Sequence, residues 1–91
     1  MKQTNYLQGV FWDYPQFIIE SAVEQTLEQS RREEDTPLYR WMMVRFLEYG
    51  RAIDTLRYFS IEDIDNHLAD LLIRPETRKK WQRLIEVYGA D

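Results

Sequence analysis

The sequence lacks cysteine, and its 91 residues include only three glycines, three prolines and one histidine. The absence of cysteine excludes disulfide bonds and thiolate metal sites, which fits a reducing cytoplasm. No apolar run approaches the length of a membrane span, and the N-terminus carries no apolar stretch of signal-peptide length. We therefore expect a cytoplasmic globular domain with no contact to a membrane.

The net charge is -4, and the charged residues are unevenly distributed. Residues 1–36 carry seven acidic and three basic side chains, whereas residues 74–91 carry five basic and three acidic ones. The negative total disfavours broad nonspecific binding to nucleic acid but is compatible with a local basic patch. The imbalance reflects either solvated helix faces of different composition or two binding surfaces of opposite sign.

The few prolines and glycines divide the second half of the chain into short helices. Pro37 and Pro75 stand where helices start, Gly50 and Gly89 where they end, and Ser60 is placed to cap another helix. With the apolar spacing, these positions predict helices over residues 15–32, 37–49, 52–59, 61–72 and 75–88. The predicted fold class is therefore all-α, a compact bundle of about five short helices.

Residues 1–14 are rich in aromatic side chains but show little helical periodicity. We predict an extended aromatic N-terminal arm over residues 1–14 and a single helical domain over residues 15–91. The rings of Tyr6, Phe11 and Trp12 either cap the core of their own domain or dock on a partner. Asp13 is expected to cap the first long helix, whose first turn contains Pro15.

The predicted helices differ in their apolar faces. The helix over 37–49 is apolar nearly all round, so we expect it to be central, or an oligomer interface if its own chain leaves it uncovered. The other helices are expected to bury one stripe each, formed by Ile19, Ala22, Val23, Thr26 and Leu27, by Ile61, Ile64, Leu68, Leu71 and Leu72, and by Trp81, Leu84, Ile85 and Tyr88. Away from the first of these stripes, an i, i+4 series of acids faces water, at Glu20, Glu24 and Glu28.

No catalytic signature is present, since the chain lacks GxGxxG, GK[ST], HExxH and GxSxG motifs. His67 has Asp63 and Asp70 at helical spacing, which is a recognisable set of metal ligands. Acids at the start of a helix also suit the helix dipole, so we expect no metal there. Neighbouring acids such as Glu62 and Asp63 would need a pocket that separates their pKa values to act as acid and base. We expect no enzymatic activity and no cofactor.

The last two predicted helices are joined by a short link, Ile73-Arg74-Pro75, which is compatible with a helix-turn-helix. Bases near a helix start oppose the dipole, which hints at a use, but the link lacks the glycine common in such turns. The bases are placed to contact DNA phosphates, or alternatively form a solvated face or a patch for an acidic protein partner. They are Arg74, Arg78, Lys79, Lys80 and Arg83.

Several short motifs resemble those of a family of small bacterial all-α proteins. The resemblance covers roughly residues 37–89 and residues 11–13, whereas residues 16–36 depart from the family pattern. The motifs are Phe11-Trp12-Asp13, Arg45-Phe46-Leu47-Glu48-Tyr49-Gly50, an acid before an aromatic-rich stretch from Asp54 to Phe59, Ser60-Ile61-Glu62-Asp63-Ile64, and a Leu-x-x-x-Thr-x-x-x-Trp helix matched by Ile73, Thr77, Arg78 and Trp81. Such proteins are often encoded beside nucleotidyltransferase-type toxins of abortive-infection systems. The resemblance therefore implies an antitoxin-like or accessory protein that binds such a toxin.

The preferred hypothesis is a non-enzymatic protein-interaction module, an antitoxin-like or regulatory partner of a bacterial nucleotidyltransferase-type toxin. The expected partner contacts are Tyr6, Phe11 and Trp12, together with Glu20, Glu24 and Glu28, which would mask a cationic site on the toxin by charge complementarity. One alternative is a DNA-binding regulator of helix-turn-helix type that uses the basic start of the last helix. The other is a structural homo-oligomer formed through the helix over 37–49.

Overall fold

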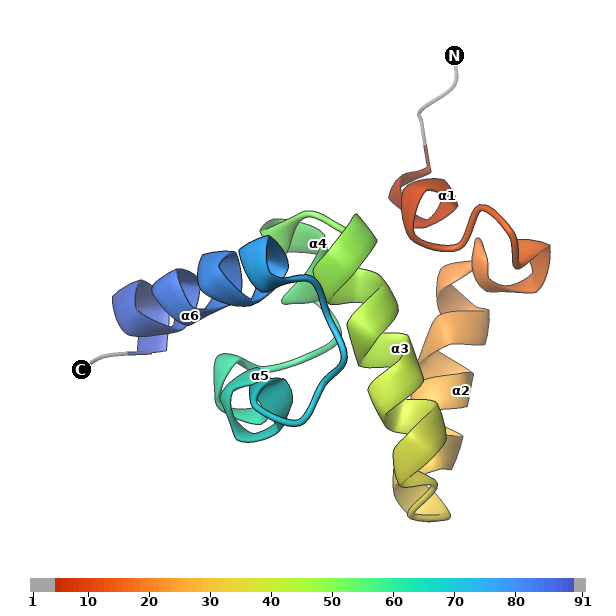
Figure 1. Cartoon of the computed structure of the whole chain (residues 1–91). Coiled ribbons are helices and arrows are strands. Elements are labelled where there is room, and N and C mark those ends of the chain that lie inside the picture. The colour runs from red at the N-terminus through yellow and green to blue at the C-terminus, as the bar shows by residue number, and fades with distance from the viewer. Residues whose placement is uncertain (1–4, 90–91) are drawn as a thin grey trace.

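The computed structural model describes residues 5–89, which form six α-helices and one turn of 3-10 helix, with no strand in this range. In chain order they are α1 (Tyr6–Val10), the 3-10 turn η1 (Pro15–Phe17), α2 (Glu20–Arg32), α3 (Thr36–Tyr49), α4 (Ala52–Thr55), α5 (Ile61–Leu68) and α6 (Pro75–Gly89). Figure 1 shows α3 in the middle, with α1 and α2 on one side and α5 and α6 on the other. The predicted compact all-α class is confirmed. None of the helices within these residues combines the length and apolar character of a membrane-spanning segment.

The central helix of the fold is α3. Four other helices, α1, α2, α4 and α6, pack against it. Asp35 caps its start, because one carboxylate oxygen accepts a hydrogen bond from the backbone N–H of Leu38 at 3.2 Å. The apolar side chains that suggested an oligomer interface are largely covered by the chain itself, with the following residues buried: Tyr39, Met42, Met43, Phe46 and Leu47. The prediction of a central helix is confirmed.

The N-terminal segment is not an extended arm in the part that the structure describes. Residues 6–10 form α1, and the side-chain oxygen of Asn5 caps it by accepting from the N–H of Leu7 at 2.9 Å. The side chains of Leu7, Val10 and Phe11 are fully buried in the same core as the rest of the chain. The extended conformation was wrong because burial of these side chains stabilises a helix too short to persist alone. Residues 1–4 of the predicted arm lie outside the described residues.

The helix predicted over residues 15–32 is interrupted. The 3-10 turn covers only Pro15–Phe17, and α2 begins at Glu20 without a side-chain cap. Asp13 does not cap this segment, because its carboxylate pairs with Arg45 instead. The interruption lets Phe17 and Ile18 pack against the core before the chain turns into α2. Ile19, predicted on the buried stripe, is therefore 58% exposed.

The helix α5 is shorter than predicted, and two side chains expected on buried stripes of α5 and α6 are exposed. The guanidinium of Arg78 donates hydrogen bonds to the carbonyls of Leu68 and Leu71, so the end of α5 is satisfied at Leu68 and not at residue 72. Leu72, predicted on the buried stripe, is 93% exposed. Tyr88, also predicted on a buried stripe, is 66% exposed, although the neighbouring Gly89 lies beside Ile61 at the start of α5.

Candidate protein-interaction surface

Two exposed aromatic side chains, Trp12 and Tyr49, form one surface where the end of α1 meets the end of α3. Their ring centroids lie 4.7 Å apart and their planes meet at 86°, which is an edge-to-face pair. Trp12 is 57% exposed and Tyr49 is 48% exposed. Edge-to-face pairing adds about 0.5–1.5 kcal/mol to the effect of burial alone. The two rings therefore hold each other in place while they face solvent.

Arg45 supports this pair from within the fold, since its side chain is only 12% exposed. Its guanidinium carbon lies 4.6 Å from the ring centroid of Trp12 and 5.3 Å from that of Tyr49. Its nitrogens donate to the backbone carbonyl of Val10 at 3.0 and 2.7 Å and pair with the carboxylate of Asp13 at 2.5 Å. Three further rings surround the same guanidinium, those of Phe11, Tyr14 and Trp41. Fixed hydrogen bonds and cation–π attraction leave Trp12 and Tyr49 little freedom to move. We call Trp12, Arg45 and Tyr49 the aromatic patch.

A hollow of about 370 Å³ adjoins Tyr49, between α1 and the start of α4. Gly50 lies at its base, where α1 approaches the end of α3 closely. A Cβ at Gly50 would lie 2.9 Å from the carbonyl oxygen of Phe46 and 3.2 Å from a methyl group of Val10. The backbone of Gly50 is extended (φ -97°), a conformation that any residue can adopt. Glycine is therefore required at this position by the lack of space for a side chain and not by a left-handed backbone.

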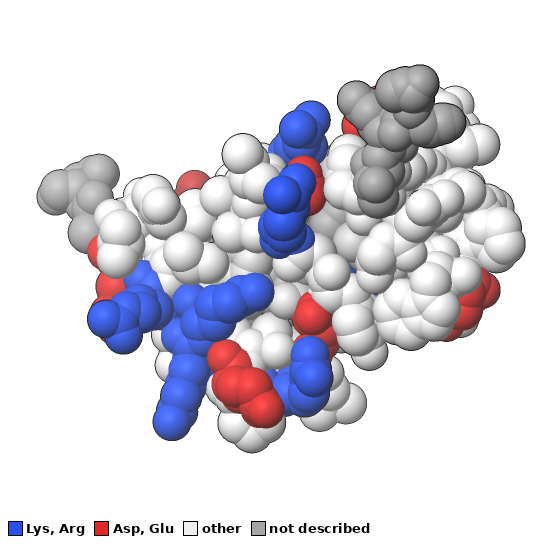
Figure 2. All heavy atoms as spheres, turned by 90° about the horizontal axis from the view of Figure 1, so that it is seen from above, with Lys and Arg blue, Asp and Glu red and all other residues white. Residues whose placement is uncertain are grey.

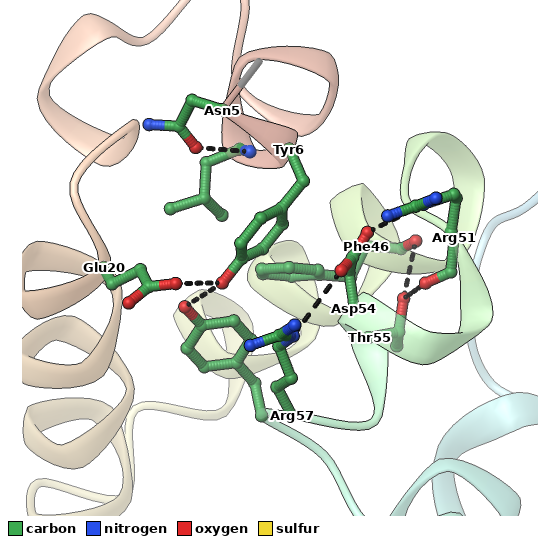
Figure 3. A network of polar contacts seen from close by, with 10 residues as sticks. Asn5, Tyr6, Glu20, Phe46, Arg51, Asp54, Thr55 and Arg57 are labelled. Atoms are coloured by element: carbon green, nitrogen blue, oxygen red, sulfur yellow. Dashed lines mark hydrogen bonds and ion pairs between the residues drawn. The ribbon is translucent and has the colours of Figure 1, made fainter. Parts of the chain in front are cut away.

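Tyr6 lies within a polar network and does not present its hydroxyl freely to a partner. The hydroxyl donates to the carboxylate of Glu20 at 2.7 Å and lies 2.9 Å from the hydroxyl of Tyr58 (Figure 3). Burial raises the pKa of Tyr6 most, and the hydrogen bonds with Tyr58 and Glu20 raise it further, so the hydroxyl stays protonated. The network therefore ties α1 to α2 and to the segment that follows α4.

Beside this network, the carboxylate of Asp54 is buried between two arginines. Its oxygens lie 3.1 Å from Nε of Arg51 and 3.5 Å from Nε of Arg57 (Figure 3). Thr55, the next residue, donates from its hydroxyl to the carbonyl of Phe46 at 3.2 Å or to that of Arg51 at 2.9 Å. These contacts attach the short α4 to the end of α3. Asp54, the acid that precedes the aromatic-rich stretch of the motif pattern, therefore has a structural role.

His67 lies in an open hollow of about 440 Å³ between the end of α2, the start of α3 and α5. Its Nδ1 lies 2.9 Å from the carbonyl oxygen of Asp63 and 3.7 Å from the carboxylate of the same residue. That carboxylate also accepts from the hydroxyl of Tyr39, whose pKa is raised by burial and then by this hydrogen bond. Asp70 lies instead 3.8 Å from Arg40. Across residues 5–89, no three His, Cys, Asp or Glu side chains are placed to hold a metal ion.

The five predicted basic contacts divide into two groups. Arg74 is bound to Glu48, with its backbone N–H at 2.6 Å and its Nε at 2.7 Å from the carboxylate oxygens. Arg78 is occupied by the carbonyls at the end of α5. The other three are exposed and form no ion pair within the described part of the chain: Lys79, Lys80 and Arg83. Figure 2 shows basic side chains gathered over α6.

The acidic stripe on α2 is exposed, as expected for a solvated face. Glu20 accepts the hydrogen bond from Tyr6, and Glu28 lies 3.7 Å from Arg32. Glu24 forms neither an ion pair nor a side-chain hydrogen bond with any of residues 5–89. The stripe therefore presents one carboxylate that the fold does not use.

Among the predicted aromatic contacts, the structure exposes Trp12 and buries Phe11 completely. Phe11 therefore belongs to the core, which is one of the two roles considered for these rings, and it cannot reach a partner in this fold. The sequence reasoning missed Arg45 and Tyr49 as members of a surface. The sequence did contain one signal, because Phe11-Trp12-Asp13 and the segment over residues 45–50 are both motifs of the same family pattern. In the structure the two motifs are in contact, since Asp13 pairs with Arg45 and Trp12 packs against Tyr49.

Comparison of the chain with known protein families, with curated proteins and with solved structures gives no match.

Proposed function

We propose that this chain is a non-enzymatic protein-interaction module that binds its partner through the aromatic patch. The observation that supports this is the Trp12–Tyr49 pair, which is about half exposed and yet held by the buried side chain of Arg45. Tryptophan, tyrosine and arginine dominate the binding energy of protein interfaces. Side chains that are already ordered lose little entropy on binding, so more of the contact energy appears as affinity.

The motif resemblance suggests the class of partner, a nucleotidyltransferase-type toxin, and an antitoxin-like role for the chain. Two of the resembling motifs meet in the aromatic patch through Trp12, Asp13, Arg45 and Tyr49. The exposed carboxylates of α2, Glu24 above all, supply negative charge that complements the cationic site such an enzyme needs for nucleotides.

DNA binding through α6 is the second candidate. It is favoured by the three exposed bases Lys79, Lys80 and Arg83, which have no ion-pair partner among the described residues (Figure 2). It is weakened by Arg74 and Arg78, which the fold already uses.

The test of the proposed function is calorimetric titration of the purified chain with the protein encoded by the neighbouring gene. Trp12→Ala and Tyr49→Ala should each weaken binding at least about tenfold, as truncation of a dominant contact does. Val87→Ala is the control, because Val87 is also exposed (64%) but belongs to α6, which contributes no residue to the aromatic patch. No binding by the wild type, or binding that these aromatic substitutions leave unchanged, would contradict the proposal.

Retention of duplex DNA at low salt tests the second candidate. The Lys79→Glu, Arg83→Glu double variant should abolish retention and leave the helix content unchanged. If the wild-type protein fails to bind DNA at low salt, the DNA-binding hypothesis is wrong.

A further inference from the structure

A groove runs between α5 and the C-terminal half of α6. These two helices lie on the opposite side of α3 from α1 (Figure 1). Two adjoining hollows, of about 480 and 680 Å³, share Asp65, Ile85 and Glu86 as lining residues. The lining is mixed: the half-buried Ile61 and Ile85 contribute apolar surface, and polar and charged side chains supply the rest. Tyr88 lines the far end and is 66% exposed. The last turns of α6 thus carry apolar surface that no described part of the chain covers.

Every charged side chain that lines this groove is acidic. They are Glu62 and Asp65 from α5 and Glu86 from α6. Glu62, Asp65 and Glu86 are exposed, and no ion pair or side-chain hydrogen bond joins any of them to another described residue. Like charges around a partly apolar lining concentrate a negative potential there, and a ligand with positive charge beside its apolar surface relieves it.

We propose that this groove docks a cationic amphipathic helix of another protein. Such a helix would place an apolar stripe at i, i+3, i+4 and i+7 on Ile61, Ile85 and Tyr88. Lysine or arginine side chains flanking the stripe would lie against Glu62, Asp65 and Glu86. The eight residues of α5 span about 12 Å, so the groove accommodates about two turns of a docked helix. The site is distinct from the aromatic patch and does not depend on the proposed function.

A second copy of this chain is a poorer occupant than a different protein. The exposed bases of α6, Lys79, Lys80 and Arg83, supply the required charge. The large apolar side chains of the same helix face its own core, where Trp81 is fully buried and Leu84 is partly buried. A second α6 therefore offers exposed apolar side chains, Val87 and Tyr88, only in its last turn and not along the stretch that carries the bases.

The test uses a synthetic amidated peptide of about 18 residues with leucines on one helical face and lysines on the other, and a scrambled peptide of the same composition. Calorimetry measures affinity, and backbone NMR shifts of the full chain locate the contact. We expect the helical peptide to bind more tightly than the scrambled one and to shift resonances of α5 and α6. The Asp65→Lys, Glu86→Lys double variant should weaken binding at least about tenfold, and Tyr88→Ala should weaken it severalfold.

The matched control is the Glu24→Lys, Glu28→Lys double variant, which makes the same charge change on α2 and should leave affinity within about twofold. Equal weakening by both double variants, or equal affinity for the scrambled peptide, would indicate general charge attraction and overturn the proposal. Resonance shifts centred on Trp12 and Tyr49 would also overturn it. So would a dimer in sedimentation that the Asp65→Lys, Glu86→Lys variant abolishes, because a second copy would then be the occupant. Tyr88→Ala removes an exposed ring, so an effect on binding with unchanged helix content cannot be attributed to misfolding.

Discussion

Arg45 connects the N-terminal segment to the central helix at the level of one side chain. Its hydrogen bonds reach the carbonyl of Val10, which is 35 positions away in the sequence, and its ion pair reaches Asp13. Because the guanidinium is planar and presents several donors in one plane, it can satisfy both acceptors and stack against rings at the same time. A lysine has the same charge but not this geometry.

We predict that Arg45→Lys lowers the free energy of unfolding by about 1–3 kcal/mol, since the carbonyl of Val10 and the carboxylate of Asp13 lose shared donors in a mostly buried site. Urea unfolding followed by circular dichroism measures the change. Arg83→Lys is the matched control, because Arg83 is exposed on α6, and its effect should stay within about 0.5 kcal/mol. Equal stability of the two variants would contradict the role assigned to Arg45.

Glu48 is a second residue whose side chain joins distant parts of the chain. Its carboxylate, 8% exposed, accepts from the backbone N–H and Nε of Arg74 and, at 3.0 Å, from the hydroxyl of Thr77. Burial alone would raise the pKa of Glu48, but the hydrogen bonds from Arg74 and Thr77 outweigh burial and lower it. The carboxylate is thus more acidic in the folded chain than in the unfolded one.

A lowered pKa in the folded state means that Glu48 stabilises the fold above its ordinary pKa of about 4.3, and that this contribution disappears as pH falls through the folded-state value. We therefore expect Glu48→Gln to be less stable than the wild type near neutral pH and to approach it below about pH 4. Urea unfolding at a series of pH values measures the difference. Glu24→Gln, at an exposed position, should show no such pH-dependent gap; a gap for Glu48→Gln that stays constant with pH would refute this account.

At the scale of elements, the junction of α2 and α3 is a tight reversal built around Glu34. Its backbone adopts φ 54°, in the left-handed region. The N–H of Glu34 bonds the carbonyl of Arg31 at 3.2 Å, and that of Asp35 bonds the carbonyl of Ser30 at 2.8 Å. This is the Schellman arrangement, in which glycine usually occupies the left-handed position. A β-carbon there costs about 1–2 kcal/mol.

We predict that Glu34→Gly raises the free energy of unfolding by about 0.5–1.5 kcal/mol, the relief of strain being partly offset by the greater entropy of the unfolded glycine chain. Thermal unfolding followed by circular dichroism measures the gain. Glu33→Gly is the neighbouring control, since Glu33 has φ -92° and gains nothing from glycine. It should lower stability. A loss of stability in both variants would show that Glu34 is not strained.

At the scale of the whole molecule, one core joins the N-terminal segment to the remaining helices. Phe11 contacts Phe46 of α3 at a centroid distance of 5.7 Å, and Phe46 in turn contacts Phe59 at 5.6 Å. Leu7 and Val10 are fully buried in the same cluster. The segment is therefore an integral part of the fold, and the aromatic patch is anchored to this core through Phe11 and Arg45.

We predict that Leu7→Ala destabilises the whole chain by about 2–5 kcal/mol, as truncation of a buried leucine does. The expected result is an earlier urea midpoint for every helix, since one core is shared. The control is Leu72→Ala, the same substitution at a side chain that is 93% exposed, with an effect near zero. If Leu7→Ala were as harmless as Leu72→Ala, the N-terminal segment would not be part of the folded core.

The two surfaces lie on either side of α3, the aromatic patch beside α1 and the acidic groove between α5 and α6 (Figure 1). No residue is shared between them. The two proposals together predict that a partner bound at one surface leaves the other accessible.

Features that depend on neighbours along the chain could be predicted from the sequence. Pro37 and Pro75 mark the first turns of α3 and α6, and α3 ends before Gly50. Ser60 caps α5, accepting from the N–H of Asp63 at 3.0 Å. The apolar composition of residues 37–49 indicated the central helix. These signals act over one helical turn, so a linear sequence displays them completely.

The remaining features could not be predicted from the sequence, because the contacts that establish them join residues far apart along the chain. Periodicity could not place Leu7 and Phe11 in the core, which turned an apparent arm into α1. Nor could it show that Arg78 is taken up by the end of α5, or that Arg45 holds Trp12 against Tyr49. In each case the stabilising free energy comes from a contact that forms only after the helices have packed. The local sequence pattern therefore does not indicate that contact.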